Sequence, residues 1–483
     1  MGILRDGFVR ICSATIWCLV TCLLSSNAQN KPWITAYYAG WQLGDGKSGY
    51  PPISAVDYTC VTDVVVFCLV PRTDGTLDTT SNSITRAGWT GLIKAAHAVG
   101  TKVLISVGGW ATETGFLGAT SPSVLPMFVS NLVSFMDNGG FDGIDIDWEP
   151  LSDADAANFK SLAAALRNAI QNKSPSPILT TTCIGGNQAL MSSVQQYFDR
   201  INIMTYDMSG NYSGWVSWYN SPVYNGGNKF PGTTEYLPSI DADVSSFNSA
   251  GVSPQKMGIG AELGGTIWQG LTLPLQLLSG LTSIAYDVPL YSYNGSGIMQ
   301  KYYGASNYHW DPGAQVGYLS IPALLGLTGT FISYDDSNSI KAKIQYIKEK
   351  GLGGLILYEL GMGYPGNGSY PLLKSIKASV VDTSSTSGVT RESELPASPT
   401  LDYNFPNPFN PTTTIRFGLP RQVHANLAIF NELGQKVEVL VDGEQERGFH
   451  EVMFDGTRFP SGVYFCRLQA GSFIETRKLS LIR

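Results

Sequence analysis

Three carboxylates share one short segment of the chain with large apolar residues. Asp145, Asp147 and Glu149 each follow a bulky apolar side chain within residues 141–150. Read as a β-strand, this period of two places the acids on one face and the apolar groups on the other. Unpaired charge is costly in an ordinary core. Neighbouring carboxylates raise one another's pKa, so one of them could stay protonated near neutral pH and protonate the leaving oxygen of a glycosidic bond.

Acids at this spacing also occur in calcium loops and on solvated acidic edges. Calcium loops interleave their acids with glycine and polar residues, whereas the intervening residues here are Ile144, Ile146 and Trp148. The four histidines are scattered, and no Cys/His cluster has metal-ligand spacing. We therefore expect neither a metal nor another cofactor.

The acid segment resembles the signature Asp-x-x-Asp-x-Asp-x-Glu of the family-18 glycoside hydrolases, the chitinase-like family. Asp142, Asp145, Asp147 and Glu149 occupy its four positions. Other segments resemble motifs of the same family in the same order, and the resemblance covers about residues 33–380.

The resemblance implies a catalytic role for each of three acids. Glu149 would protonate the glycosidic oxygen, while the substrate's own 2-acetamido oxygen would attack the anomeric carbon, so that no second carboxylate nucleophile is needed. Asp147 would accept the acetamido N–H and stabilise the positive intermediate. Asp145 would share a proton with Asp147, so that the acids titrate as a coupled set. The anomeric configuration would be retained.

Residues 204–207 resemble the family's Met-x-Tyr-Asp motif. The match implies that Tyr206 holds the acetamido oxygen and that Asp207 binds the sugar or the catalytic acids. A structural hydrogen bond is the alternative for this pair, but barrel enzymes draw catalytic groups from several strand ends.

Residues 106–109 resemble the family's Ser-x-Gly-Gly motif. The glycines would let the backbone pass close to the acids. Ser106 would hydrogen-bond to the Asp145 network, and Asp142 is expected to support the acids from behind in the same way. Trp110 would face the cleft as a sugar platform, with core packing as the alternative.

The chain from residue 31 to residue 380 alternates apolar strands with amphipathic helices. Eight strand candidates are mostly continuous apolar runs, typical of parallel strands buried on both faces. They are residues 34–40, 61–70, 102–108, 143–149, 178–184, 200–205, 256–261 and 354–358. Helical spacing between them, as in residues 159–170, predicts an α/β fold, a (β/α)8 TIM barrel with its active site at the C-terminal ends of the strands. Glu149 ends the fourth strand.

Aromatic residues at two other strand ends are candidates for sugar contacts. Tyr37, Tyr38 and Trp41 end the first strand; one tyrosine must point into the barrel and the other out, and we favour Tyr38. Tyr358 stands where the family usually has a tryptophan floor, which argues against crystalline chitin as the substrate. Core packing is an equally good explanation for four further tryptophans, Trp215, Trp218, Trp268 and Trp310.

Residues 264–331 are too many for a simple loop after the seventh strand. The segment is rich in Tyr, Gly and Trp. A small inserted subdomain that walls a cleft and a long irregular loop are both consistent with it.

The N-terminal end and the region beyond the barrel differ from it in composition. Residues 1–28 have the pattern of a secretory signal peptide, with Arg5 and Arg10 at or before the start of the apolar run 11–24. This run is too short for a comfortable membrane span, although an uncleaved anchor is the alternative. Residues 381–400 are rich in Ser, Thr, Pro and Glu, which predicts a linker.

Residues 401–483 predict a C-terminal immunoglobulin-like β-sandwich, because short alternating apolar runs are separated by turn signals. Val463 and Phe465 form one such alternation. The run 404–413 resembles the C-terminal sorting domains of the type IX secretion system. That resemblance implies a bacterial secretion machinery as partner and a secreted, extracellular or cell-surface location. An accessory carbohydrate-binding sandwich is the alternative.

The composition suits a large, well-buried enzyme, with 14% charged residues and 53 glycines. The net charge is −7 and no basic run occurs, so nucleic acid is not expected as a partner. A neutral glycan fits better, and we expect a monomer. Cys68 and Cys183 lie in apolar runs, which favours buried free thiols.

The acid signature leaves the substrate open. One hypothesis is a secreted chitinase acting on β-1,4-linked N-acetylglucosamine polymers and chitooligosaccharides. A second is an endo-β-N-acetylglucosaminidase acting on glycoprotein or other N-acetylated glycans. A third is a catalytically silent chitin-binding lectin; family lectins commonly lose the terminal glutamate, and Glu149 is present.

Overall fold

The computed structural model describes residues 31–43, 51–292, 295–304, 306–323, 328–366, 370–381, 399–401, 404, 409 and 411–482. The expected signal peptide and residues 382–398 of the expected linker lie outside this part of the chain. Within the described residues, no helix has both the length and the apolar character needed to cross a membrane.

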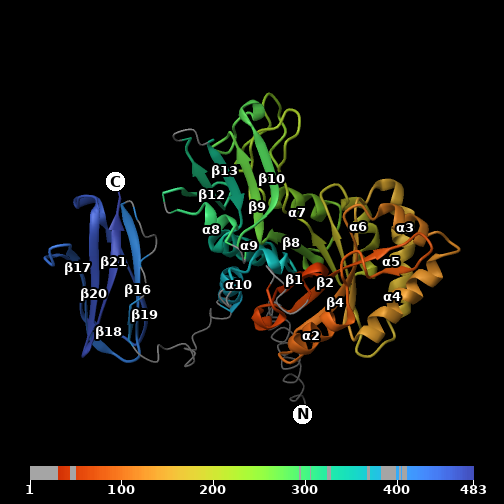
Figure 1. Cartoon of the computed structure of the whole chain (residues 1–483), viewed down its shortest axis with the longest axis horizontal. Helices are drawn as coiled ribbons and strands as arrows, with labels where there is room; N and C mark the ends of the chain where they lie inside the picture. Colours follow the sequence, from red (N-terminus) through yellow and green to blue (C-terminus); the bar gives the residue numbers. More distant parts are fainter. Residues whose placement is uncertain are drawn as a thin grey trace, which may run out of the picture.

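Eight parallel strands close into a barrel (Figure 1). They are β1 (Trp33–Ala39), β2 (Asp63–Pro71), β4 (Lys102–Gly109), β5 (Gly143–Trp148), β6 (Ile178–Cys183), β7 (Arg200–Ile203), β8 (Met257–Glu262) and β14 (Gly354–Tyr358). The order is β1-β14-β8-β7-β6-β5-β4-β2, and pairing of β1 with β2 closes the ring. A short strand, β3 (Leu77–Asp78), forms a hairpin with β2. The eight expected strands are all present, with ends that differ by no more than about two residues, the usual uncertainty of such boundaries.

Helices surround the barrel (Figure 1). They are α2 (Arg86–His97), α3 (Glu113–Ala119), α4 (Leu125–Gly139), α5 (Ala156–Ile170), α6 (Gln188–Val194), α7 (Ile240–Ser249), α9 (Ser337–Lys350) and α10 (Pro371–Val381). The apolar residues of α5 at helical spacing are buried, as expected. Helix α9 begins after Asp336, whose carboxylate accepts the N–H groups of Asn338 and Ser339, and ends at Gly351 in the left-handed conformation.

The segment after β8 is an inserted subdomain, which decides between the two alternatives left by the sequence. It holds an antiparallel sheet in the order β10-β9-β13-β12-β11. The elements are β9 (Gly264–Gln269), β10 (Ser283–Pro289), the short helix α8 (Ile298–Lys301), β11 (Tyr308–Asp311), β12 (Val316–Ile321) and β13 (Thr330–Tyr334). Trp218 and Trp268 are fully buried in a separate hydrophobic core that the subdomain shares with the segment between β7 and α7, so both serve packing.

The C-terminal region forms two antiparallel sheets around a second core. One sheet contains β15 (Thr400–Leu401), β16 (Thr412–Leu419) and β19 (Gly448–Asp455); the other contains β17 (Val423–Asn431), β18 (Lys436–Gln445), β20 (Gly462–Ala470) and β21 (Phe473–Leu481). Tyr464, Cys466 and Leu468 face the core, whereas Val463 and Phe465 lie on the opposite face. The alternation of Val463 and Phe465 is thus on the outer face of this strand; both faces carry apolar residues, so alternation alone does not choose the buried one.

Candidate active site

Strand β5 places its carboxylates in the barrel interior. Asp145 and Asp147 are buried, and Glu149, one residue past the strand, is half-buried at the mouth. On the opposite face, Trp148 stacks on Phe116 of α3, with ring centroids 4.4 Å apart and planes 7° apart. The predicted two-sided strand is present: the acids point inward because the apolar residues bury their side chains against the helices.

Gly108 of β4 is opposite Asp147 in the sheet register. A Cβ atom at Gly108 would lie 1.8 Å from the carbonyl oxygen of Asp147, and its φ of 130° is one that side chains rarely adopt. Glycine therefore lets β4 approach the backbone that carries the acids, as the Ser-x-Gly-Gly resemblance implied.

Asp145 is held by three hydroxyl groups. Its carboxylate accepts hydrogen bonds from Tyr37 at 3.2 Å, Ser106 at 3.0 Å and Thr180 at 2.5 Å. Burial raises the pKa of Asp145, and the three hydrogen bonds counteract part of that rise. The expected contact from Ser106 is present, and this acid is fully enclosed by the protein.

Asp147 and Glu149 are hydrogen-bonded to each other. Burial raises the pKa of Asp147 well above its usual range, and the charges of Glu149 and Asp145 raise it further. Burial also raises the pKa of Glu149, while the hydrogen bond from Asp147 lowers it. The other partner of Asp147 is the hydroxyl of Thr182. Asp147 therefore interacts with both neighbouring acids: it is hydrogen-bonded to Glu149, and the charge of Asp145 raises its pKa. Proton sharing between Asp145 and Asp147 stays a prediction.

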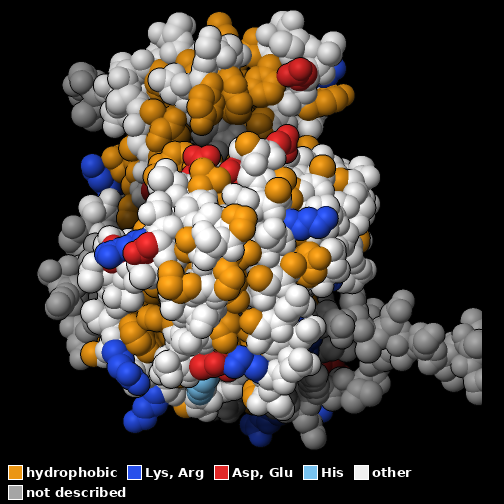
Figure 2. All heavy atoms as spheres, turned by 90° about the vertical axis from the view of Figure 1, so that its right-hand side faces the viewer, with side chains coloured by type: hydrophobic (Ala, Val, Ile, Leu, Met, Phe, Trp, Pro, Cys, Tyr) orange, Lys and Arg blue, Asp and Glu red, His pale blue; other side chains and the backbone are white. Residues whose placement is uncertain are grey.

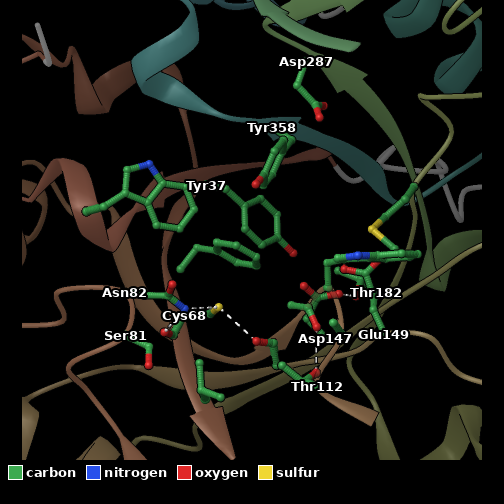
Figure 3. Close-up of a pocket in the computed structure, with 18 of the residues that line it drawn as sticks. Tyr37, Cys68, Ser81, Asn82, Thr112, Asp147, Glu149, Thr182, Asp287 and Tyr358 are labelled. Carbon is green, nitrogen blue, oxygen red and sulfur yellow. Dashed lines mark hydrogen bonds between the residues drawn. The ribbon is translucent and has the colours of Figure 1, made fainter. Parts of the chain in front are cut away.

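A cavity of about 530 Å³ opens over these two acids (Figure 3). Figure 2 shows acidic side chains in a hollow beneath a wall rich in hydrophobic side chains. Aromatic and acidic residues from several strand ends and from the subdomain line the cavity; they include Tyr37, Trp41, Phe67, Trp110, Asp147, Glu149, Tyr206, Asp207, Asp287 and Tyr358. This position, at the C-terminal ends of the strands, is where the barrel fold predicts an active site.

Tyr206 and Asp207 follow β7 and face this cavity. The ring of Tyr206 stacks on that of Tyr358, with centroids 6.0 Å apart and planes at 19°. Burial raises the pKa of Tyr206, so its hydroxyl stays a neutral hydrogen-bond donor. Asp207 is open to the cavity, but burial by the surrounding protein, together with the charges of Asp287 and Glu149, raises its pKa to about 7.

Tyr37, and not Tyr38, faces the site. The Tyr37 hydroxyl binds Asp145, and its ring lines the cavity. Tyr38 points to the other side of β1, where its hydroxyl donates to the carbonyl of Pro51 at 2.7 Å. The preference for Tyr38 was wrong because inward positions on β1 follow Thr35, which binds Asp63 inside the barrel, at a period of two.

Asp142 does not support the catalytic acids. It precedes β5 at the opposite end of the strand, about 10 Å from Asp145 at the rise of an extended chain. Its carboxylate accepts the N–H of Val103 and contacts the His97 ring, both at 2.7 Å. The expectation for this residue was wrong: it joins β4, α2 and the start of β5 at the far end of the barrel.

Three of the expected sugar-contact aromatic residues line the cavity. Trp110 has 79% of its surface exposed and Trp41 has 42%, so neither is a core residue. Tyr358 lies deeper, within 6.2 Å of the Tyr37 ring centroid and 5.7 Å of Phe67. Exposed indole faces in a concave, partly acidic cavity can stack on the apolar faces of sugar rings.

Several site residues were missed from the sequence. Thr180 and Thr182 of β6 alternate with the same period as the acids that they bind, so their spacing could have identified them. Phe67 of β2 also lines the cavity. Asp287 comes from β10 of the subdomain (Figure 3), and no pattern in the sequence links it to the barrel acids.

The described residues contain no group of three or more His, Cys, Asp or Glu side chains that could hold a metal ion. The four cysteines in this region, Cys60, Cys68, Cys183 and Cys466, are buried free thiols, as expected for Cys68 and Cys183. The arrangement can hold one proton between the buried Asp147 and the half-buried Glu149, beside the neutral hydroxyl of Tyr206.

Two parts of the chain match known protein families. Residues 34–363 match the family model of the glycosyl hydrolases family 18, and residues 404–482 match that of the secretion system C-terminal sorting domain. Endochitinase 1 of Metarhizium robertsii is 30% identical over 58% of this chain and 66% of its own length. The chain thus spans less than two thirds of that relative.

Two solved structures share the fold. The Group IV chitinase of Ostrinia furnacalis in complex with allosamidin has a TM-score of 0.58 and 23% identity, over 73% of this chain and 99% of its own. Human YKL-39, described as a pseudo-chitinase with retained chitooligosaccharide binding, has a TM-score of 0.60 and 20% identity, over 72% of this chain and 100% of its own. At such identities the likeness extends to the fold and leaves activity open.

Proposed function

The chain belongs to family 18 of the glycosyl hydrolases, and from that premise we propose that it is a secreted, retaining hydrolase of β-1,4-linked N-acetylglucosamine polymers. The observation that carries this proposal is the Asp147–Glu149 pair under an open cavity. A half-buried glutamate with a raised pKa suits a general acid, and the largely buried aspartate beside it, at the base of the same cavity, suits a hydrogen-bond partner for that acid.

In the proposed first step, Glu149 gives its proton to the glycosidic oxygen as the bond to the anomeric carbon breaks. The oxygen of the 2-acetamido group forms the new bond to that carbon, and the sugar chain departs as an alcohol. Burial of Glu149 supports this role, because a raised pKa keeps the acid protonated to higher pH. Water then opens the cyclic intermediate on the same face as the original bond, and Glu149 takes the proton back.

Asp147 and Tyr206 would orient the acetamido group. The Asp147 carboxylate would accept the acetamido N–H and stabilise the positive charge of the cyclic intermediate. The neutral hydroxyl of Tyr206, at the same cavity, would donate to the acetamido oxygen. Asp145 keeps the row of acids in place through Tyr37, Ser106 and Thr180, and does not itself line the cavity.

The remaining cavity residues would bind the sugars on either side of the scissile bond. Trp110 and Trp41 present exposed indole faces, and Tyr358 forms part of the floor. Asp207 would accept hydrogen bonds from sugar hydroxyls at the rim. Tyrosine in place of a larger floor ring supports soluble oligosaccharides and single chains as substrates over crystalline chitin.

We also propose the division of the chain that goes with this activity. Residues 31–380 would be the catalytic unit, and residues 401–483 would direct the protein to a bacterial secretion machinery, consistent with the sorting-domain match. The enzyme would then act outside the cell or attached to its surface, as a monomer on a glycan.

Product analysis tests the proposed substrate. We expect incubation with the N-acetylglucosamine hexamer to release shorter N-acetylated oligomers, measured by mass spectrometry, and a high-mannose glycopeptide to remain intact. Cleavage of the glycopeptide alone would replace the proposed activity with that of an endo-β-N-acetylglucosaminidase. Tight hexamer binding with no released reducing ends would instead indicate a lectin.

A further inference from the structure

The carboxylate of Asp207 reaches the cavity from a backbone conformation that needs support. Asp207 has a φ of 53°, in the left-handed region that residues other than glycine seldom adopt. Asn220 holds this turn through two hydrogen bonds. Its Oδ1 accepts the N–H of Asp207 at 3.1 Å, and its backbone carbonyl accepts the N–H of Met208 at 3.0 Å. Asn220 does not line the cavity, so any effect on substrate would pass through Asp207.

The side chain of Asn220 has a single orientation. It is buried, and its Oδ1 also accepts the hydroxyl of Thr266 at 3.3 Å. Its Nδ2 donates to the carboxylate of Glu262. An amide oxygen that faces two donors and an amide nitrogen that faces a carboxylate cannot exchange places without losing these hydrogen bonds. The backbone N–H of Asn220 donates to the hydroxyl of Ser333 at 2.7 Å, which fixes the segment to β13.

Buried charged groups clamp this segment from behind. Glu262 is fully buried at the end of β8, and its backbone N–H donates to Asp335 at 3.3 Å. Asp335 pairs with Lys343 of α9, with Oδ2 and Nζ 2.5 Å apart. The same Nζ donates to the hydroxyl of Ser221 at 2.6 Å, next to Asn220 in the chain. Burying charges is costly, and such groups are retained in some proteins because they fix one geometry.

We propose that Asn220, oriented by Glu262, is a positioning residue that fixes the Asp207 carboxylate in the cleft and so sets the affinity for the sugar that Asp207 contacts. The proposal rests on the proposed function, since it takes Asp207 as a sugar contact. It also gives the subdomain a second role. Strands β9 and β13, through Thr266 and Ser333, brace the loop that carries Asp207, in addition to supplying a wall of the cleft.

A double-mutant cycle on the full chain tests this coupling. Asn220→Ala and Asp207→Ala are each expected to raise KM for the N-acetylglucosamine hexamer by about tenfold, with kcat within a few fold of wild type. The double variant is expected to show no further loss beyond Asp207→Ala, because the two residues act as one unit. The dissociation constant of the hexamer, measured by calorimetry, should follow the same pattern.

If the rise in KM of the double variant equalled the product of the two single rises, the proposal would be overturned, since Asn220 would then act independently of Asp207. Asn131→Ala is the matched control: it also removes a side-chain amide that hydrogen-bonds to backbone, to Gly75 at 2.9 Å, but away from the cavity. We expect it to leave KM unchanged. If Asn220→Ala does not fold, Glu262→Leu replaces it in the cycle, because it frees the Asn220 amide and leaves the Asp335–Lys343 ion pair intact. Absence of wild-type turnover would refute the proposed function, while the binding cycle would still decide the positioning role.

Discussion

Glu149→Gln is expected to abolish most turnover while oligosaccharide binding survives. Glutamine has nearly the same volume and can still accept the hydrogen bond from Asp147, but it has no proton to give to the leaving oxygen. The expected fall in kcat on the N-acetylglucosamine hexamer is at least the factor of about 10²–10⁴ that a general acid contributes. Binding, measured by calorimetry, should stay within a few fold of wild type.

The pH profile provides a second check on the same residue. Only protonated Glu149 can act, so the wild-type rate should fall as pH rises through its pKa, which burial places above the usual glutamate range. This limb should disappear in Glu149→Gln. Glu359→Gln is the control, because Glu359, like Glu149, comes just after a barrel strand and has a pKa raised by burial, but does not line the cavity. Wild-type-like turnover in Glu149→Gln would refute the assignment.

Asp147→Asn is expected to lower kcat by about 10²–10³, the cost of removing one preorganised electrostatic group from a transition state. Asparagine can still accept a hydrogen bond, but it has no charge to stabilise the positive intermediate. The melting temperature should not fall. The folded-state pKa of Asp147 is raised, so its charged form destabilises the fold above the pKa of the unfolded chain, and a neutral amide removes that cost.

Asp145→Asn is the control for this prediction, because Asp145 is equally buried but does not line the cavity. Its effect on kcat should be smaller than that of Asp147→Asn. If Asp147→Asn lowered the melting temperature and hexamer binding together with kcat, the loss would reflect a damaged site and not a missing charge.

The barrel and its acids could be predicted because β5 has a sequence pattern that differs from those of the other barrel strands. Burial on both faces of the other strands gives continuous apolar runs, while β5 interrupts its run with an acid at every second position. Ser106 and Gly108 were predicted from the resemblance to the family's Ser-x-Gly-Gly motif. The structure gives the physical reason, because the register of β4 beside β5 sets Ser106 opposite Asp145 and Gly108 opposite Asp147.

Two kinds of feature could not be predicted from the sequence. One is which residues of a strand face the barrel interior, and the other is which residues far apart in the chain come into contact. Tyr37 and Tyr38 are both buried and chemically equivalent, so only the register of β1 decides which one enters the barrel. Asp142 shares the motif with the catalytic acids, but the rise of the strand carries it to the opposite end of the barrel. Asp287 reaches the cavity from the subdomain, and Asn220 is held behind Asp207 by hydrogen bonds to the subdomain. Such tertiary contacts leave no periodic pattern in the chain.

The most direct test of substrate-assisted catalysis compares two substrates that differ only in the group said to attack. Initial rates would be measured with the wild-type enzyme on the N-acetylglucosamine hexamer and on its fully de-acetylated counterpart. The account predicts cleavage of the first and no measurable cleavage of the second, because the amine has no oxygen to bond to the anomeric carbon. Comparable rates on the two hexamers would contradict it.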